Sequence, residues 1–308
     1  MRTQLAGGFR PLAGFSLARG AAAHTFGTMS TITRSVRRIV QLTLIAAVVV
    51  FPGVAANSQT AATVASSGPG APDRHVQRLA SEARTADLRG NWDGLMRAHD
   101  AIAGMPAPAT GAEWIDYYLG YIDWRQSSLA FMAEGMTGTA ALLRHAAEHL
   151  MRALEAVPGF TEARLLLVLV DGASINSDSS RVAELAPRLR ANSQTVMTDA
   201  PENPRVKFLR AFMGFYLPGR SRAEKDAALV SWREAAEAFP KKPSAREPEW
   251  GRAEAWAWLG GTLLADGKPA AAKNALEHAI ADRKDFWWAR DLALPQATRS
   301  RTSHAPTR

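Results

Sequence analysis

Five residues near the middle of the sequence have the types and spacing of a zinc-binding motif. His145 and His149 are four residues apart, so their imidazoles would lie on one face of a helix and could bind a single metal ion. Glu148 lies beside them and could act as the general base on a metal-bound water molecule. The pattern indicates metal-dependent hydrolysis as one alternative.

This H-x-x-E-H pattern resembles the zinc signature of the inverzincin peptidases. Those enzymes use large α/β domains, and the sequence around the motif has no strand pattern. Ala146 and Leu150 also occupy packing positions of the same helix, which turns the histidines away from the packed side. We therefore expect a solvated helix face, with adventitious metal binding and catalysis as the alternatives. We predict no catalytic residue, no resident metal and no cofactor.

Aromatic residues form a second pattern. Trp114, Tyr117, Tyr121 and Trp124 follow one another at helical spacing and end at Arg125, so they make one stripe along a helix. Such a stripe is either core or the wall of an apolar binding groove. In the groove interpretation, equivalent faces of later helices continue it. The predicted groove residues are Trp114, Tyr117, Tyr121, Trp124, Arg125, Leu165, Leu169, Phe208 and Phe215.

Asp116, Asp123 and Ser127 form a polar line on the same predicted helix. Paired carboxylates can perform acid–base chemistry, but such residues more often pair with arginine or face water. The sequence contains no Gly-rich phosphate loop, nucleophile elbow or dinucleotide fingerprint.

The elements that must position these residues are helical. The clearest stretch is Ala253 to Lys284, where Gly260 follows an apolar stripe, Asp266-Gly267 breaks the first helix and Pro269 begins the second. This stretch resembles a tetratricopeptide repeat, whose pattern is Trp-x2-Leu-Gly-x2-Tyr followed by Ala-x3-Phe. The matching residues are Trp256, Leu259, Gly260, Ala272, Leu276 and Ala279.

The same spacing recurs twice upstream. A Leu-Gly or Met-Gly step precedes an Ala-x3-large-x2-Ala-x4-Pro pattern in each case, and a glycine at that step would let two helices approach closely. One set is Gly120, Ala146, Leu150, Ala153 and Pro158; the other is Gly214, Ala228, Trp232, Ala235 and Pro240. In the first set, 14 extra residues separate the two halves, which predicts a lengthened first helix and a longer loop.

The resemblance implies an all-α, right-handed superhelix of about five helical hairpins, whose concave side binds a protein or peptide. The segment 241–248 is predicted to be a linker before the fifth hairpin. A helix over 285–294, with three consecutive aromatic residues, is predicted to cap the last repeat.

Charge and cysteine content exclude several classes of function. The net charge of +8 comes from the two ends of the chain, because residues 58–298 hold 28 basic and 29 acidic side chains. This middle part offers no basic field to a nucleic acid. The absence of cysteine excludes disulfides, thiolate metal sites and a cysteine nucleophile.

The N-terminal part has the pattern of a secretory signal. Arg34, Arg37 and Arg38 precede an apolar run from Ile39 to Phe51, and small residues end at Ala56, after which we predict cleavage. This predicts export to the periplasm or medium, with no stable membrane span after cleavage. The predicted organisation is an extension upstream of the natural start (1–28), a signal peptide (29–56), a flexible linker (57–72), a helical repeat domain (73–294) and a disordered basic tail (295–308).

The sequence thus favours an exported, non-catalytic scaffold that binds a protein or peptide partner in the cell envelope; its oligomeric state stays open. One alternative is a periplasmic carrier that holds an apolar small molecule on the aromatic stripe. The other is a zinc peptidase that uses His145, Glu148 and His149.

Overall fold

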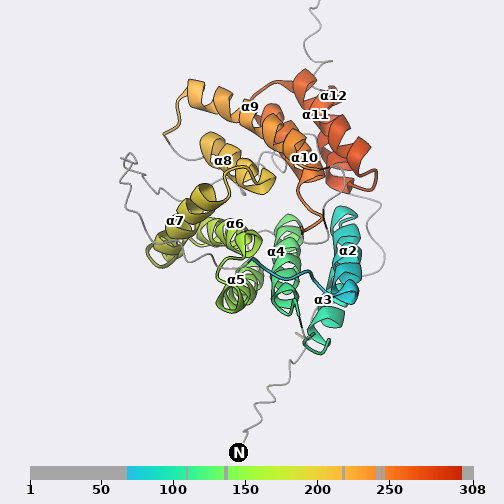
Figure 1. The fold of residues 1–308 in the computed structure, drawn as a ribbon. Coiled ribbons are helices and arrows are strands. Elements are labelled where there is room, and N and C mark those ends of the chain that lie inside the picture. Colours follow the sequence, from blue (N-terminus) through green and yellow to red (C-terminus); the bar gives the residue numbers. More distant parts are fainter. Residues whose placement is uncertain are drawn as a thin grey trace, which may run out of the picture. The chain divides into compact units, whose positions relative to one another are not determined.

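The computed structural model describes residues 68–108, 110–134, 138–216, 219–240, 244 and 247–299, and within them it is helical with no β-strand (Figure 1). The helices are α2 (Arg74–Leu88), α3 (Trp92–Ala103), α4 (Glu113–Glu134), α5 (Thr139–Ala156), α6 (Thr161–Ser177), α7 (Val182–Asp199), α8 (Pro204–Tyr216), α9 (Arg222–Ala238), α10 (Arg252–Ala265), α11 (Pro269–Asp282) and α12 (Leu294–Arg299). A short 3₁₀ helix η1 (Ser179–Arg181) precedes α7, and a π-helix η2 (Trp288–Ala293) precedes α12. The predicted all-α class is confirmed.

Consecutive helices pack against each other along the described chain, from α2 on α3 to α10 on α11. Local sequence explains the sharp turns between them. Gly90 adopts a positive φ of 63° after α2, and the Asn91 side chain then accepts a hydrogen bond from the Gly94 N–H and caps α3. Gly267 plays the same part between α10 and α11, with φ of 73°.

Three glycines allow close contact between paired helices. A Cβ atom added at Gly120 would lie 2.8 Å from Leu150 Cγ, and one added at Gly260 would lie 2.6 Å from Leu276 Cγ. These distances are shorter than real Cβ contacts, so a larger residue would force the helices apart. The three contacts are Gly120 of α4 with Leu150 of α5, Gly214 of α8 with Ala228 of α9, and Gly260 of α10 with Leu276 of α11. The structure therefore brings together the residues that the sequence pattern pairs.

The other predicted packing residues also lie in the core. They are Ala146, Ala153, Trp232, Ala235, Trp256, Leu259, Ala272 and Ala279, while Pro158 and Pro240 follow the ends of α5 and α9. Helix α4 is 22 residues long, as the extra residues in the sequence predict.

The buried side chains form two apolar clusters. The first is built mainly from α2 to α8, and the second mainly from α8 to α12. Two residues depart from this order, because Leu88 of α2 lies in the second cluster and Trp250, before α10, lies in the first. Contacts therefore join helices far apart in the sequence.

Both ends of the described chain differ from the predicted boundaries. Gly70, within the predicted flexible linker, is held by two hydrogen bonds: its N–H donates to Glu113 Oε1 (2.9 Å) and its carbonyl accepts from Trp114 Nε1 (2.7 Å). At the other end, α12 continues to Arg299, so the first residues of the predicted disordered tail are helical. The predicted cap over 285–294 contains the π-helix η2.

The predicted upstream extension and signal peptide lie outside the described residues. None of the helices in the described part of the chain is both long enough and apolar enough to span a bilayer.

Candidate functional site

The first three residues of the aromatic stripe on α4 belong to the core. Trp114 and Tyr117 have no exposed surface, and Tyr121 is 2% exposed. Phe160, at the start of α6, packs against the rings of Trp114 (centroids 4.7 Å apart) and Tyr117 (5.2 Å). The burial of these three residues favours the core interpretation of the stripe, because neighbouring side chains cover them and they do not form the wall of an open groove.

Trp250 covers the stripe. Its Nε1–H donates a 2.8 Å hydrogen bond to the Tyr117 hydroxyl, and its ring stacks on that of Tyr121 with an angle of 22° between planes. Periodicity and spacing do not predict this contact, because Trp250 lies just after a predicted linker and outside the repeat pattern.

Arg205 of α8 fixes the segment that carries Trp250. Its buried guanidinium donates to the Trp250 carbonyl (3.0 Å from Nε) and to the Pro248 carbonyl, and it forms an ion pair with Glu162 (3.3 Å). The end of the predicted linker is thus an ordered part of the core.

Most of the remaining predicted groove residues also belong to the core. Leu165, Phe208 and Phe215 are buried, and Leu169 is partly buried in the first cluster. The Phe208 ring meets Trp232 edge-on at 4.6 Å in the second cluster. Of the predicted groove residues, Trp124 and Arg125 alone line the pocket described next.

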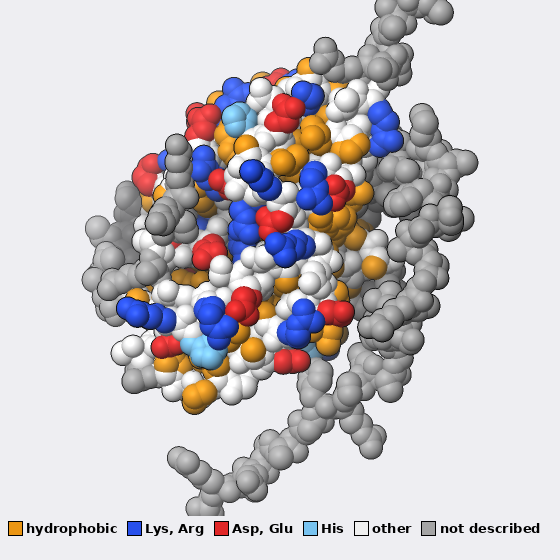
Figure 2. All heavy atoms as spheres, turned by 90° about the vertical axis from the view of Figure 1, so that its right-hand side faces the viewer, with side chains coloured by type: hydrophobic (Ala, Val, Ile, Leu, Met, Phe, Trp, Pro, Cys, Tyr) orange, Lys and Arg blue, Asp and Glu red, His pale blue; other side chains and the backbone are white. Residues whose placement is uncertain are grey.

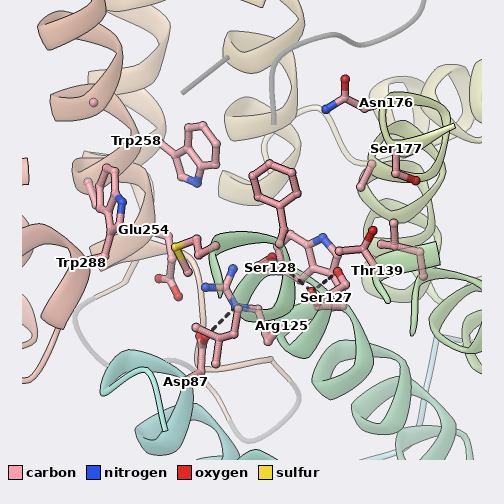
Figure 3. A pocket seen from close by; sticks show the side chains of 18 of the residues that line it. Asp87, Arg125, Ser127, Ser128, Thr139, Asn176, Ser177, Glu254, Trp258 and Trp288 are labelled. Atoms are coloured by element: carbon pink, nitrogen blue, oxygen red, sulfur yellow. Dashed lines mark hydrogen bonds and ion pairs between the residues drawn. The ribbon is translucent and has the colours of Figure 1, made fainter. Parts of the chain in front are cut away.

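This pocket has a volume of about 160 Å³ and lies among α4, α5, α6, α10 and the segment before η2 (Figure 3). Four tryptophans contribute to its wall: Trp124, Trp258, Trp287 and Trp288. The other apolar side chains that line it are Leu129, Phe131, Met132, Leu143, Ala173, Ala257 and Phe286. Aromatic side chains of α4, α10 and residues 286–288 thus surround a space that no side chain fills.

One side of the pocket carries charged residues that pair with one another. Arg125 Nε donates a 2.8 Å hydrogen bond to Asp87 Oδ1 (Figure 3). The Arg125 guanidinium also lies 5.0 Å from the centre of the Trp124 ring. Arg84 binds Glu254 through both of its terminal nitrogens, one of them at 2.8 Å. Asp87, Arg125 and Glu254 line the pocket, and Arg84 neutralises Glu254 from outside the lining, so the two arginines and two carboxylates balance in charge.

Burial and pairing act in opposite directions on these groups. Burial alone would raise the pKa of the Glu254 carboxyl, but the Arg84 guanidinium outweighs it and holds this pKa below its ordinary value. The same ion pair raises the pKa of Arg84 against the opposing effect of burial. Both side chains therefore stay charged at neutral pH and join α2 to α10.

Two polar atoms at the pocket have no hydrogen-bond partner within the described part of the chain. They are Asn176 Oδ1, an acceptor, and Trp288 Nε1, a donor. A polar group of a ligand that reached these buried atoms could form a hydrogen bond with either of them.

The H-x-x-E-H residues do not form the pair that the motif predicts. His145 is partly buried, Glu148 is exposed, and His149 turns its Nδ1 toward Asp116 Oδ1 at 2.8 Å. The close group of possible metal ligands that the described residues form contains His149 but neither of the other two.

The predicted polar line on α4 is split among three environments. Asp116 contacts His149 and Arg152, and Ser127 donates its hydroxyl to the Trp124 carbonyl at 2.7 Å. Asp123 is buried, and burial together with the nearby Glu148 charge raises its pKa to about 7. These side chains are not arranged as one acid–base pair.

Sequence reasoning missed Asp87, Glu254, Trp258 and Trp250. A signal exists for one member of each charged pair: Arg84 and Asp87 stand four residues after Ala80 and Ala83, so they lie on the apolar face of α2. Charged residues on an apolar helix face require partners, but a single sequence cannot say which ones.

No protein-family model matches the chain, and no curated protein matches it in sequence. Its function is therefore inferred from the geometry of the site.

Proposed function

We propose that this protein is an exported, non-catalytic binding protein of tetratricopeptide-like helical hairpins, and that it takes one apolar side chain of a protein partner into the pocket beside Trp124. The observation that carries the proposal is the convergence of four tryptophans on one unfilled apolar pocket. The repeated close contacts at Gly120, Gly214 and Gly260 support the repeat assignment.

The size of the pocket favours a partner protein over a carried small molecule. Pockets for drug-sized ligands have volumes of roughly 300–1,000 Å³, whereas a cavity of about 150 Å³ accommodates benzene. The volume of about 160 Å³ here suits one aromatic or branched aliphatic side chain. Aromatic pockets of this kind commonly hold the anchor residue of a partner segment.

The surface charges agree with a protein partner rather than a nucleic acid. On the face in Figure 2, basic and acidic side chains are intermixed and do not gather into a basic stripe. A phosphate backbone would gain little from such a face.

Filling the pocket tests the proposal. Ala173→Phe adds a ring at a partly buried position that lines the pocket, whereas Ala141→Phe makes the same change at an exposed position of α5. Each variant would be used to capture proteins from the envelope of the native host. We expect a protein that the wild type and Ala141→Phe both retain to be lost with Ala173→Phe.

Equal capture by both variants would show that the pocket is not the binding site. Native mass spectrometry of the purified protein examines the carrier alternative. A bound small molecule that is present in the wild type and absent from Ala173→Phe would contradict the proposal of a partner protein and favour an apolar small-molecule ligand.

A further inference from the structure

Three side chains from successive helices converge at a second place, which the proposed function does not use. They are His99 of α3, Asp123 of α4 and His149 of α5, and one ligand atom of each lies within 4.8 Å of the others. His99 Nε2 is 3.4 Å from Asp123 Oδ1, and the two imidazole rings meet edge-on with centroids 6.3 Å apart.

These side chains are largely shielded from water. The Asp123 side chain is 5% exposed, that of His149 is 17% exposed and that of His99 is 27% exposed. A carboxylate shielded to this degree normally has its oxygens hydrogen-bonded or paired with a cation.

Asp123 lacks that compensation within the described part of the chain. Its Oδ2 atom is buried and has no hydrogen-bond partner, and its ion-pair contact is with His99 rather than with an arginine or lysine. A cation between Asp123 and the two imidazoles would satisfy this oxygen.

The surroundings of His149 prepare its other nitrogen for a metal. Asp116 Oδ1 lies 2.8 Å from His149 Nδ1, and Arg152 Nε holds the same carboxylate at 3.0 Å. Metal-binding histidines typically donate one ring N–H to a carboxylate, which leaves the second nitrogen unprotonated and correctly turned.

Arg152 Nη2 also approaches His149 Nδ1 and would compete for it if that nitrogen were an acceptor. The Arg152 side chain is 49% exposed and already bonded to Asp116, so it can keep its carboxylate contact without this one. The charged Asp116 oxygen is the stronger partner for a ring N–H.

We propose that His99, Asp123 and His149 form a binding site for a divalent transition-metal ion of the zinc class. Two imidazoles and one carboxylate are ligands that zinc prefers, whereas magnesium and calcium prefer oxygen ligands alone. Metal–ligand distances of about 2.0–2.2 Å place tetrahedral donors roughly 3.3 Å apart. The His99–Asp123 distance is already 3.4 Å, and a ligand atom of His149 lies within 4.8 Å of the other two, so metal binding requires His149 to approach them.

Such an ion would tie α3, α4 and α5 together and keep a fourth position for water or another ligand. This site differs from the H-x-x-E-H motif in its ligands, because it shares His149 with the motif but draws the others from two different helices. The two histidines of the proposed site, His99 and His149, are 50 residues apart in the sequence, whereas those of the motif are four residues apart.

Zinc titration of the untagged full chain, after removal of metal with a chelator, tests the site. We expect one zinc ion per chain by calorimetry. His99→Gln and Asp123→Asn are each expected to weaken zinc binding by at least about 100-fold, since loss of an outer-shell partner alone costs 10–100-fold. Asp116→Asn is expected to fall in that 10–100-fold range.

His145→Gln is the matched control, and it should leave zinc affinity within about 2-fold of the wild type, since His145 is not among the three ligands. Loss of binding in His145→Gln with retention in His99→Gln would overturn the site in favour of the motif. Absence of saturable zinc binding to the wild type would overturn it altogether.

Folding of the variants is followed by circular dichroism. If His99→Gln fails to fold, Asp123→Asn decides the outcome, because the amide has the shape of the carboxylate and removes a buried charge without opening a cavity. Wild-type zinc affinity in a folded Asp123→Asn variant would contradict the proposal.

Discussion

At the scale of single residues, the buried ion pair of Arg84 and Glu254 joins two distant parts of the chain. Its members lie 170 residues apart, and each side chain is less than 10% exposed. Pairs of this kind add little net stability over apolar residues, but breaking one leaves an uncompensated charge in the core.

We therefore expect Glu254→Gln to lower the free energy of unfolding by about 3–5 kcal/mol. The control is Glu82→Gln, which breaks the exposed Arg78–Glu82 pair of α2, the helix that also carries Arg84. It should lower the free energy of unfolding by less than about 1 kcal/mol. Urea denaturation of both variants measures the difference. Similar losses would mean that the buried pair is not special.

The same carboxyl predicts a pH dependence. The pKa of Glu254 in the folded protein lies below its ordinary value of 4.5, so the unfolded chain binds a proton more readily. Its contribution to stability is fully present above about pH 4.5 and is lost as pH falls through the folded-state pKa. Between pH 5 and 3, the wild type should lose more stability than Glu254→Gln does; parallel curves would contradict this.

Tyr121 and Trp124 lie on the same helix, α4, but Tyr121 belongs to the core and Trp124 lines the pocket. Tyr121 is buried, and its hydroxyl reaches Asp87 Oδ2 at 3.3 Å, whereas Trp124 is partly exposed at the pocket. Tyr121→Ala should cost about 3–5 kcal/mol of stability, as large-to-small core changes do. Trp124→Ala should cost less and should weaken partner capture instead. A Tyr121→Ala variant that melts like the wild type would show that the residue is not core.

At the scale of the elements, the glycine contacts between paired helices set how closely they approach. Helix α10 passes α11 at Gly260, where an added Cβ would press on the Leu276 side chain and on the Ala272 carbonyl at 3.3 Å. In contrast, a Cβ added at Gly172 of α6 would meet Leu189 Cδ1 at an ordinary 3.9 Å.

These two sites predict effects of opposite sign for the same substitution. Gly260→Ala should destabilise the protein by about 1–3 kcal/mol through overpacking, and the larger Gly260→Leu should cost more. Gly172→Ala should stabilise it by about 0.5–1 kcal/mol, because alanine favours a helix interior where space allows. Thermal unfolding measures both; stabilisation by Gly260→Ala would mean that α10 and α11 can separate freely.

At the scale of the whole described region, contacts between α2 and α10 alter how a local change spreads. In a linear repeat array each unit touches only its neighbours, so damage to α10 and α11 would leave α2 and α3 intact. Here the Arg84–Glu254 pair, and Leu88 in the second apolar cluster, connect them directly.

Hydrogen exchange of Glu254→Gln measures this coupling. We expect amide protection to fall in α2 as well as in α10. The change in α6 should be smaller, because the Arg84–Glu254 pair joins α2 to α10 and does not include a residue of α6. Loss confined to α10 and α11 would show that the connection carries no energy, and strictly local coupling would then describe the protein.

The sequence by itself determined the helices, their pairing and the close contacts at Gly120, Gly214 and Gly260. These features depend on residues within one helix or on two adjacent helices, so apolar periodicity and turn residues are enough to specify them. The lengthened α4 followed from the same local spacing.

Only the tertiary structure decided which aromatic residues are core and which line a pocket. An apolar stripe has the same spacing whether a neighbour covers it or not, and its cover, Trp250, comes from 133 residues away from Tyr117. The group of His99, Asp123 and His149 was equally hidden, since its ligands come from three helices. A buried charge or imidazole acquires its role from its partner, and the packing of distant helices chooses that partner.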